Sequence, residues 1–101
     1  MAKRKHKPIH PGEVLGRDFM EPLGVTAYRL SKETGITAQH IGRILKGTRG
    51  VGADMALRLA RYFGTSAQLW VNMQAKYELD VAEDQAGREI EKRVKPRSEA
   101  A

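Results

Sequence analysis

The sequence predicts a small all-α domain built around a helix-turn-helix. Residues 26–47 are typical of two short helices, each preceded by a threonine that can cap it and followed by a glycine. Residues 53–63 carry the apolar stripe of a buried helix. The length of 101 residues suits a single domain of four or five short helices.

The second helix of this motif, starting after Thr37, leads to the functional hypothesis. At about 100° per residue, one side of it is apolar: Ile41, Ile44 and Leu45. The other side holds small, amide and cationic residues and no carboxylate: Ala38, Gln39, Gly42, Arg43 and Lys46. An ordinary surface helix would mix acids with bases, whereas a helix in the DNA major groove needs small residues for close approach, glutamine for adenine and arginine for guanine. We therefore predict three base-reading residues: Ala38, Gln39 and Arg43.

Residues around this helix are expected to contact DNA phosphates, which position a protein on the duplex. The predicted backbone contacts are Tyr28, Arg29, Thr37, His40 (when protonated), Lys46, Thr48 and Arg49. The Gly-rich loop at residues 47–52 lacks the spacing and the Lys-Ser/Thr ending of a nucleotide-binding loop. We therefore predict contacts with DNA phosphates there, and no nucleotide site.

The first helix is expected to begin at Pro11, which suits the first turn of a helix. Pro22 disfavours helical geometry in the residue before it, so the helix should end near Glu21. The pair His10 and Glu13 invites a metal or catalytic interpretation. One histidine and one glutamate at a helix start more often form a cap, and we predict a cap.

Ser66 can cap a last helix that continues to about Leu79. Its large apolar stripe is expected to be divided between the core and a homodimer interface: Leu69, Trp70, Met73 and Tyr77. Gly52 is a weaker cap for the helix at residues 53–63.

The net charge of +6 is distributed unevenly. Residues 1–50 hold ten Lys/Arg against four Asp/Glu, and residues 51–101 hold eight of each. A polyanionic partner that meets one face explains such asymmetry. We divide the chain into a basic disordered arm (1–9), a DNA-binding domain (10–80) and a polar C-terminal extension (81–101) that can continue as a helix.

Several classes of protein are not expected. Cysteine is absent, so disulfides and thiolate sites are excluded. No apolar run approaches a membrane span and no signal-peptide pattern occurs, so we expect a soluble cytoplasmic protein. The three histidines are widely spaced without clustered carboxylates, and we predict no catalytic residues, no metal, no cofactor and no enzyme activity.

Residues 23–63 resemble the helix-turn-helix of XRE/Cro-type, lambda-repressor-like transcription factors. A longer pattern over roughly residues 10–80 resembles the HigA-type antitoxins of toxin–antitoxin modules. It consists of four segments: His10-Pro-Gly-Glu-Val-Leu15, Glu21-Pro-Leu-Gly24, Ile44-Leu-Lys-Gly-Thr-Arg-Gly50 and Leu69-Trp-Val-Asn-Met-Gln74. The resemblance implies a five-helix domain, a homodimer on a palindromic operator in its own promoter, and a HigB-like (RelE-type) mRNA-cleaving toxin neutralised by direct binding. The first helix and the basic arm are candidate toxin-binding surfaces.

Three alternatives remain open at this point. The first is a stand-alone repressor that uses the same DNA face and has no toxin partner. The second is a protein-interaction module that uses the aromatic stripe of the last helix, with a merely solvated basic face. RNA binding is disfavoured because the basic face lacks an aromatic platform on which bases could stack.

Overall fold

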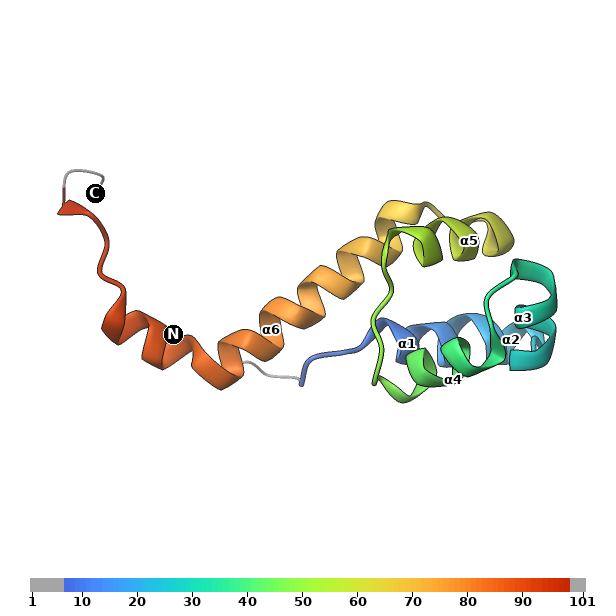
Figure 1. The fold of residues 1–101 in the computed structure, drawn as a ribbon, viewed down its shortest axis with the longest axis horizontal. Helices are drawn as coiled ribbons and strands as arrows, with labels where there is room; N and C mark the ends of the chain where they lie inside the picture. The colour runs from blue at the N-terminus through green and yellow to red at the C-terminus, as the bar shows by residue number, and fades with distance from the viewer. Residues whose placement is uncertain (1–6, 99–101) are drawn as a thin grey trace.

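The computed structural model describes residues 7–98, and within that range every regular element is a helix. The elements are α1 (Pro11–Val14), the π-helical η1 (Leu15–Met20), α2 (Glu21–Leu23), α3 (Ala27–Thr34), α4 (Ala38–Lys46), α5 (Ala53–Phe63) and α6 (Ala67–Arg93). Because α1, η1 and α2 follow one another without a break, these elements form five helical segments (Figure 1). The predicted all-α, five-helix fold is confirmed.

The first helical segment runs past its predicted end. Glu21 adopts helical angles (φ −61°, ψ −54°), and the segment ends only at Gly24, whose φ is +64°. The prediction is wrong because the chain passes through a π turn ahead of Pro22: the Glu21 amide bonds to the carbonyl of Gly16, five residues back. This wider winding lets the helix continue through a proline that a regular α-helix would not accept at that position.

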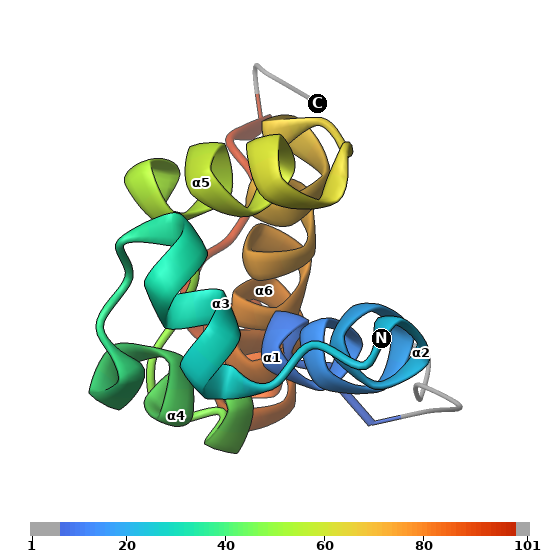
Figure 2. The ribbon, with the colours of Figure 1, turned by 90° about the vertical axis from the view of Figure 1, so that its right-hand side faces the viewer.

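The helix-turn-helix forms as its caps predict. The hydroxyl of Thr26 accepts a hydrogen bond from the Arg29 amide at 3.1 Å, and that of Thr37 accepts one from the His40 amide at 3.1 Å. Gly35 and Gly47 end the two helices with φ of +79°, which L side chains rarely adopt. In the end-on view, α3 lies between α4 and α5 (Figure 2).

The core is centred on Trp70, which is completely buried. Its ring lies 5.2 Å from that of Phe19, and Phe19 lies 5.2 Å from Phe63, so three helical segments meet at these rings. The indole N–H donates to the Thr65 hydroxyl at 2.8 Å and is therefore satisfied inside the core. The buried apolar cluster is Leu15, Met20, Leu30, Ile36, Ile41, Ile44, Val51, Met55, Ala56, Leu59, Ala60 and Trp70.

The last helix continues past Leu79 and ends at Arg93, so more than half of the polar extension at residues 81–101 is helical, as the sequence allowed. Its second half projects from the body, and the molecule measures 54 × 25 × 21 Å (Figure 1). Sparse apolar residues pointed to an earlier end, but strong helix formers and i,i+4 ion pairs such as Glu89–Arg93 continue the helix. Across residues 7–98, no helix has the length and hydropathy that a membrane span requires. Of the predicted basic arm, residues 1–6 lie outside the described range.

Candidate nucleic-acid interface

Helix α4 has one buried side and one exposed side, as its periodicity predicts. Ile41 and Ile44 are 1% and 0% exposed and belong to the core. The three predicted base-reading residues and the neighbouring Lys46 are exposed on the outer side: Ala38, Gln39, Arg43 and Lys46. This face contains amide and cationic groups and no carboxylate, so it has the donors that guanine and adenine edges require.

The inner side of α4 is held at very close range by the first helical segment. A Cβ atom on Gly12 would lie 1.8 Å from the carbonyl oxygen of Ile44, so only glycine allows this approach. His10 caps α1: its Nδ1 accepts from the Gly12 amide at 2.8 Å. The prediction that His10 acts in a cap is therefore confirmed, and this cap belongs to the support beneath α4.

The predicted phosphate-contacting residues come from α3, from α4 with its cap, and from the loop after α4. Six of them are exposed: Tyr28, Arg29, Thr37, Lys46, Thr48 and Arg49. Arg29 pairs with Glu33 at 3.5 Å, so its charge is partly compensated in the free protein. The Lys32 ammonium lies 5.6 Å from the ring centre of Tyr28, which adds a cation beside that ring. We call the six exposed residues the rim of this interface.

His40 is half-buried between α4 and the loop that follows it. Burial lowers the pKa of its imidazole, and the positive charges of Arg49 and Arg43 lower the pKa further. The free protein therefore favours the neutral form of the ring. A phosphate beside these three residues would raise the pKa of His40, because a negative charge favours the protonated ring.

Two residues that support the interface were missed by the sequence analysis. Gln74 on α6 accepts a hydrogen bond from the Val51 amide at 2.9 Å, in the loop after α4. Arg58 on α5 donates to the Thr34 carbonyl at 2.8 Å at the end of α3. The partners are 23 and 24 residues apart, so no local pattern indicates them. The only sign of Gln74 in the sequence was its place as the last residue of the segment 69–74, which carries the family resemblance.

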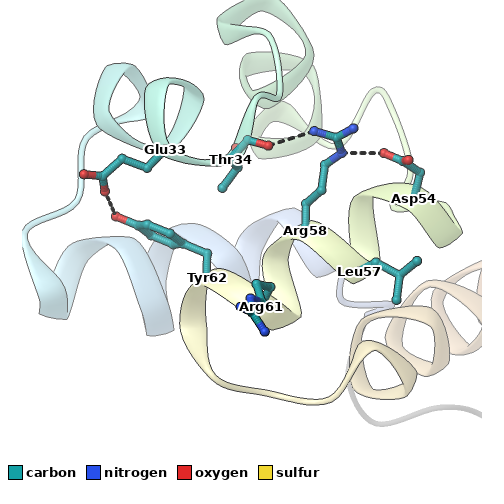
Figure 3. A pocket seen from close by; sticks show the side chains of 7 residues that line it. All are labelled: Glu33, Thr34, Asp54, Leu57, Arg58, Arg61 and Tyr62. Carbon is teal, nitrogen blue, oxygen red and sulfur yellow. Dashed lines mark hydrogen bonds and ion pairs between the residues drawn. The ribbon is translucent and has the colours of Figure 1, made fainter.

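A groove lies between α3 and α5, with a volume of about 540 Å³ (Figure 3). It is lined by Glu33, Thr34, Asp54, Leu57, Arg58, Arg61 and Tyr62. The Tyr62 hydroxyl donates to Glu33, which lowers the pKa of that carboxyl and raises the pKa of the phenol. Figure 3 shows the Arg58 guanidinium between Thr34 and Asp54, bonded to both. The hydrogen bonds from Tyr62 to Glu33 and from Arg58 to Thr34 cross this groove, so its polar groups serve to join α3 to α5.

The predicted dimer-interface residues on α6 are placed differently from one another. Leu69 is 40% exposed, and Met73 and Tyr77 are half-buried. Trp70 is 0% exposed, because its ring fills the centre of the core, so the prediction of an interface role for Trp70 is wrong. The helical period that places it near Leu69 and Met73 does not tell which residues of a wide apolar stripe face inward.

The fold and the exposed face of α4 define a helix-turn-helix protein. A helix-turn-helix family model matches residues 17–70. The chain is 44% identical over 82 residues to virulence-associated protein I of Dichelobacter nodosus, covering 81% of this chain and 76% of the relative. It is 32% identical over 80 residues to antitoxin HigA-1 of Vibrio cholerae, covering 78% and 74%.

The structural comparison agrees with the sequence comparison. The structure of Pseudomonas aeruginosa antitoxin HigA with the higBA promoter superimposes with a TM-score of 0.87 at 40% identity, covering 89% of this chain and 98% of that one. The chain therefore belongs to the HigA-type antitoxins of the helix-turn-helix family, which are DNA-binding regulators and not enzymes. Within residues 7–98 no group of three His, Cys, Asp or Glu side chains is placed to hold a metal ion.

Proposed function

We propose that this protein is a cytoplasmic antitoxin and transcriptional autorepressor, which binds operator DNA as a homodimer and neutralises a HigB-like mRNA-cleaving toxin. The observation that carries the DNA-binding part is the exposed, carboxylate-free side of α4, fixed from behind by the contact of Gly12 with Ile44. The relative from Pseudomonas aeruginosa, solved with the higBA promoter, supports the same use of this fold.

Within this proposal each exposed group of α4 has a defined part. Gln39 pairs with an adenine edge and Arg43 with a guanine edge, while Ala38 allows close approach and contacts a thymine methyl group. Phosphates on both sides bind the rim described above, which sets the register of the helix in the groove. His40 joins this rim once a phosphate stabilises its protonated form.

The experiment for operator binding compares two arginine variants. The probe is duplex DNA from the region directly upstream of the protein's own gene. Arg43→Ala should weaken binding by about 1–3 kcal/mol and relax the preference at one base position. Arg61→Ala removes another exposed arginine, on α5, and should leave base preference unchanged. If Arg43→Ala binds every sequence as the wild type does, Arg43 is not a base reader.

The dimer follows from the way this motif meets DNA. Half-sites about one helical turn apart, roughly 34 Å, are read by two copies related by a two-fold axis. Helix α6 supplies exposed apolar side chains for such a contact, among them Leu69 at 40% and Leu79 at 64% exposure. Sedimentation should give twice the chain mass, and Leu69→Glu should give the monomer. Leu23→Glu, which changes a 64% exposed leucine on α2, is the control; a wild-type monomer would refute the dimer.

Toxin neutralisation is supported by membership of the antitoxin family. The partner expected is a small basic ribonuclease encoded beside this gene, and the first helical segment and the basic arm are the proposed contact surfaces. When the two genes are co-expressed, affinity purification should recover a stoichiometric complex. This complex should not cleave mRNA. Operator binding by the protein without any co-purified ribonuclease would favour the alternative, a stand-alone repressor.

A further inference from the structure

The loop between α4 and α5 carries two of the predicted phosphate contacts, Thr48 and Arg49. Helix α4 ends with the Thr48 amide bonded to the Arg43 carbonyl at 2.9 Å. The chain then has no regular structure until Ala53. Because both exposed side chains stand on this irregular stretch, their position depends on what holds the loop from beneath.

His10 holds the first part of this loop. Its side chain is only 8% exposed, and its ring packs against the end of α4, 3.7–4.0 Å from the point where a Cβ atom of Gly47 would stand. Its Nδ1 accepts from the Gly12 amide at 2.8 Å, and the ring lies close enough to the backbone of Arg49 for that backbone to influence the pKa of the imidazole. One imidazole thus joins the start of α1 to the residue expected to bind phosphate.

Gln74 holds the second part of the loop. Its Oε1 accepts from the Val51 amide at 2.9 Å, and its Nε2 donates to Glu78 at 2.8 Å, which fixes the orientation of the side-chain amide. A Cβ atom on Gly50 would lie 2.7–2.9 Å from the atoms of this amide. A side chain at residue 50 would therefore require the Gln74 amide to move from its present position.

The two supports are connected through α6. Tyr77, one turn after Gln74, packs edge-on against the His10 ring with 4.8 Å between centroids. Residues three apart share a face of a helix, so α6 presents Gln74 and Tyr77 to the same side. The helix proposed to form the dimer thus carries one of the two residues that hold the loop, Gln74, and contacts the other, His10, through Tyr77.

We propose, on the basis of the operator binding proposed above, that His10 and Gln74 are positioning residues for DNA. They hold the loop at residues 47–51 in the conformation that places Thr48 and Arg49 on phosphates. Neither side chain touches DNA. Ordering the loop before binding removes a cost that would otherwise reduce affinity.

The main test uses a matched pair of substitutions on α6. Gln74→Met keeps the shape of the side chain and removes the acceptor for Val51. Gln68→Met makes the same change at a glutamine whose amide donates along α6 itself, to Asn72 at 2.8 Å. Both proteins are titrated with the upstream duplex at several salt concentrations, and their thermal midpoints are measured alongside.

Gln74→Met should weaken binding about three- to tenfold for all duplexes alike, since phosphate contacts carry no sequence information. The slope of log affinity against log salt should become shallower by about 1 for each phosphate that the variant no longer binds. Gln68→Met should match the wild type in both affinity and slope. A variant that is only less folded would bind more weakly by one factor at every salt concentration, with the slope unchanged.

His10→Asn provides the second variant. Its amide oxygen can replace Nδ1 as the acceptor for Gly12, whereas it cannot pack against Gly47 as the ring does or reach the backbone of Arg49. It should reproduce the shallower salt slope of Gln74→Met.

Wild-type affinity and slope in Gln74→Met, or weaker binding without a change of slope, would overturn the role of the two residues. If the wild type prefers no upstream duplex over unrelated DNA, the proposed operator binding itself fails.

Discussion

The two halves of α6 are stabilised by different forces. Between Ala67 and Tyr77 the helix contributes the fully buried Trp70 and the loop contact of Gln74. From Glu78 to Arg93 most side chains are exposed, including Ile90 at 53%, although Asp80 and Gly87 are buried. The first half depends on tertiary packing, and the second half depends largely on helix propensity and pairs four residues apart. Equal changes in the two halves should therefore have unequal effects.

The largest effect is expected for Trp70→Ala. Removing this side chain should lower the free energy of unfolding by about 3–5 kcal/mol, because it leaves a cavity between three helical segments. Ile90→Ala truncates an apolar side chain in the second half and should cost less than about 1 kcal/mol. Urea denaturation followed by circular dichroism measures both, and equal losses would show that the second half packs as tightly as the first.

Gly12→Ala should cause the next largest loss of stability. It tests the packing of the domain core, to which the first half of α6 belongs. The new methyl group would collide with the Ile44 carbonyl, so we expect the unfolding free energy to fall by about 1–3 kcal/mol or more. Gly42→Ala, on α4 with no atom within 4 Å of the new Cβ, should instead stabilise by about 0.5–1 kcal/mol. Effects of the same sign would contradict the close contact at Gly12.

Lowering the pH should also reduce the stability of the core more than that of the outer half of α6, because His10 is buried in the core. Burial lowers the pKa of His10 below its usual 6.5, so the native state favours the neutral ring. The unfolded chain binds more protons below pH 6.5, and stability should fall with decreasing pH by at most about 1.4 kcal/mol per pH unit from this group. His10→Asn should flatten this part of the unfolding free energy curve below about pH 7. An unchanged slope would mean that other groups produce it.

The smallest effect is expected in the outer half, for Arg93→Ala. Its guanidinium pairs with Glu89 across one turn, and both side chains are more than half exposed. Exposed pairs of this kind contribute about 0.3–0.5 kcal/mol, and salt screens them. The thermal midpoint should stay within the error of calorimetry at moderate salt. A shift of several degrees would indicate that this end of α6 has a packing partner in solution.

The sequence was most informative where structure is local. Thr26, Thr37 and Ser66 were predicted as caps, and each hydroxyl accepts the expected amide three residues on. The division of α4 into a buried and an exposed side was also predictable, because periodicity alone determines it. Whether Gln39 and Arg43 read bases stays a prediction.

The features that the sequence did not predict depend on contacts between segments that are distant in the chain. The bond from Val51 to Gln74, and the bond from Arg58 to the Thr34 carbonyl, each join residues more than twenty positions apart. The inward orientation of Trp70 depended on packing against Phe19. The rule applied at Glu21 was sound for an α-helix and failed because the chain wound differently there.

That winding has a consequence for how the first helical segment tolerates change in length. With bonds to the fifth preceding residue, the π turn holds one residue more than an α-helix of the same span, as an insertion would. Leu15 and Met20, five positions apart, are consequently both buried. Deleting one residue between them should therefore remove the π turn and leave the later side chains in nearly the same orientation, whereas a deletion in a regular α-helix rotates every later side chain by about 100°.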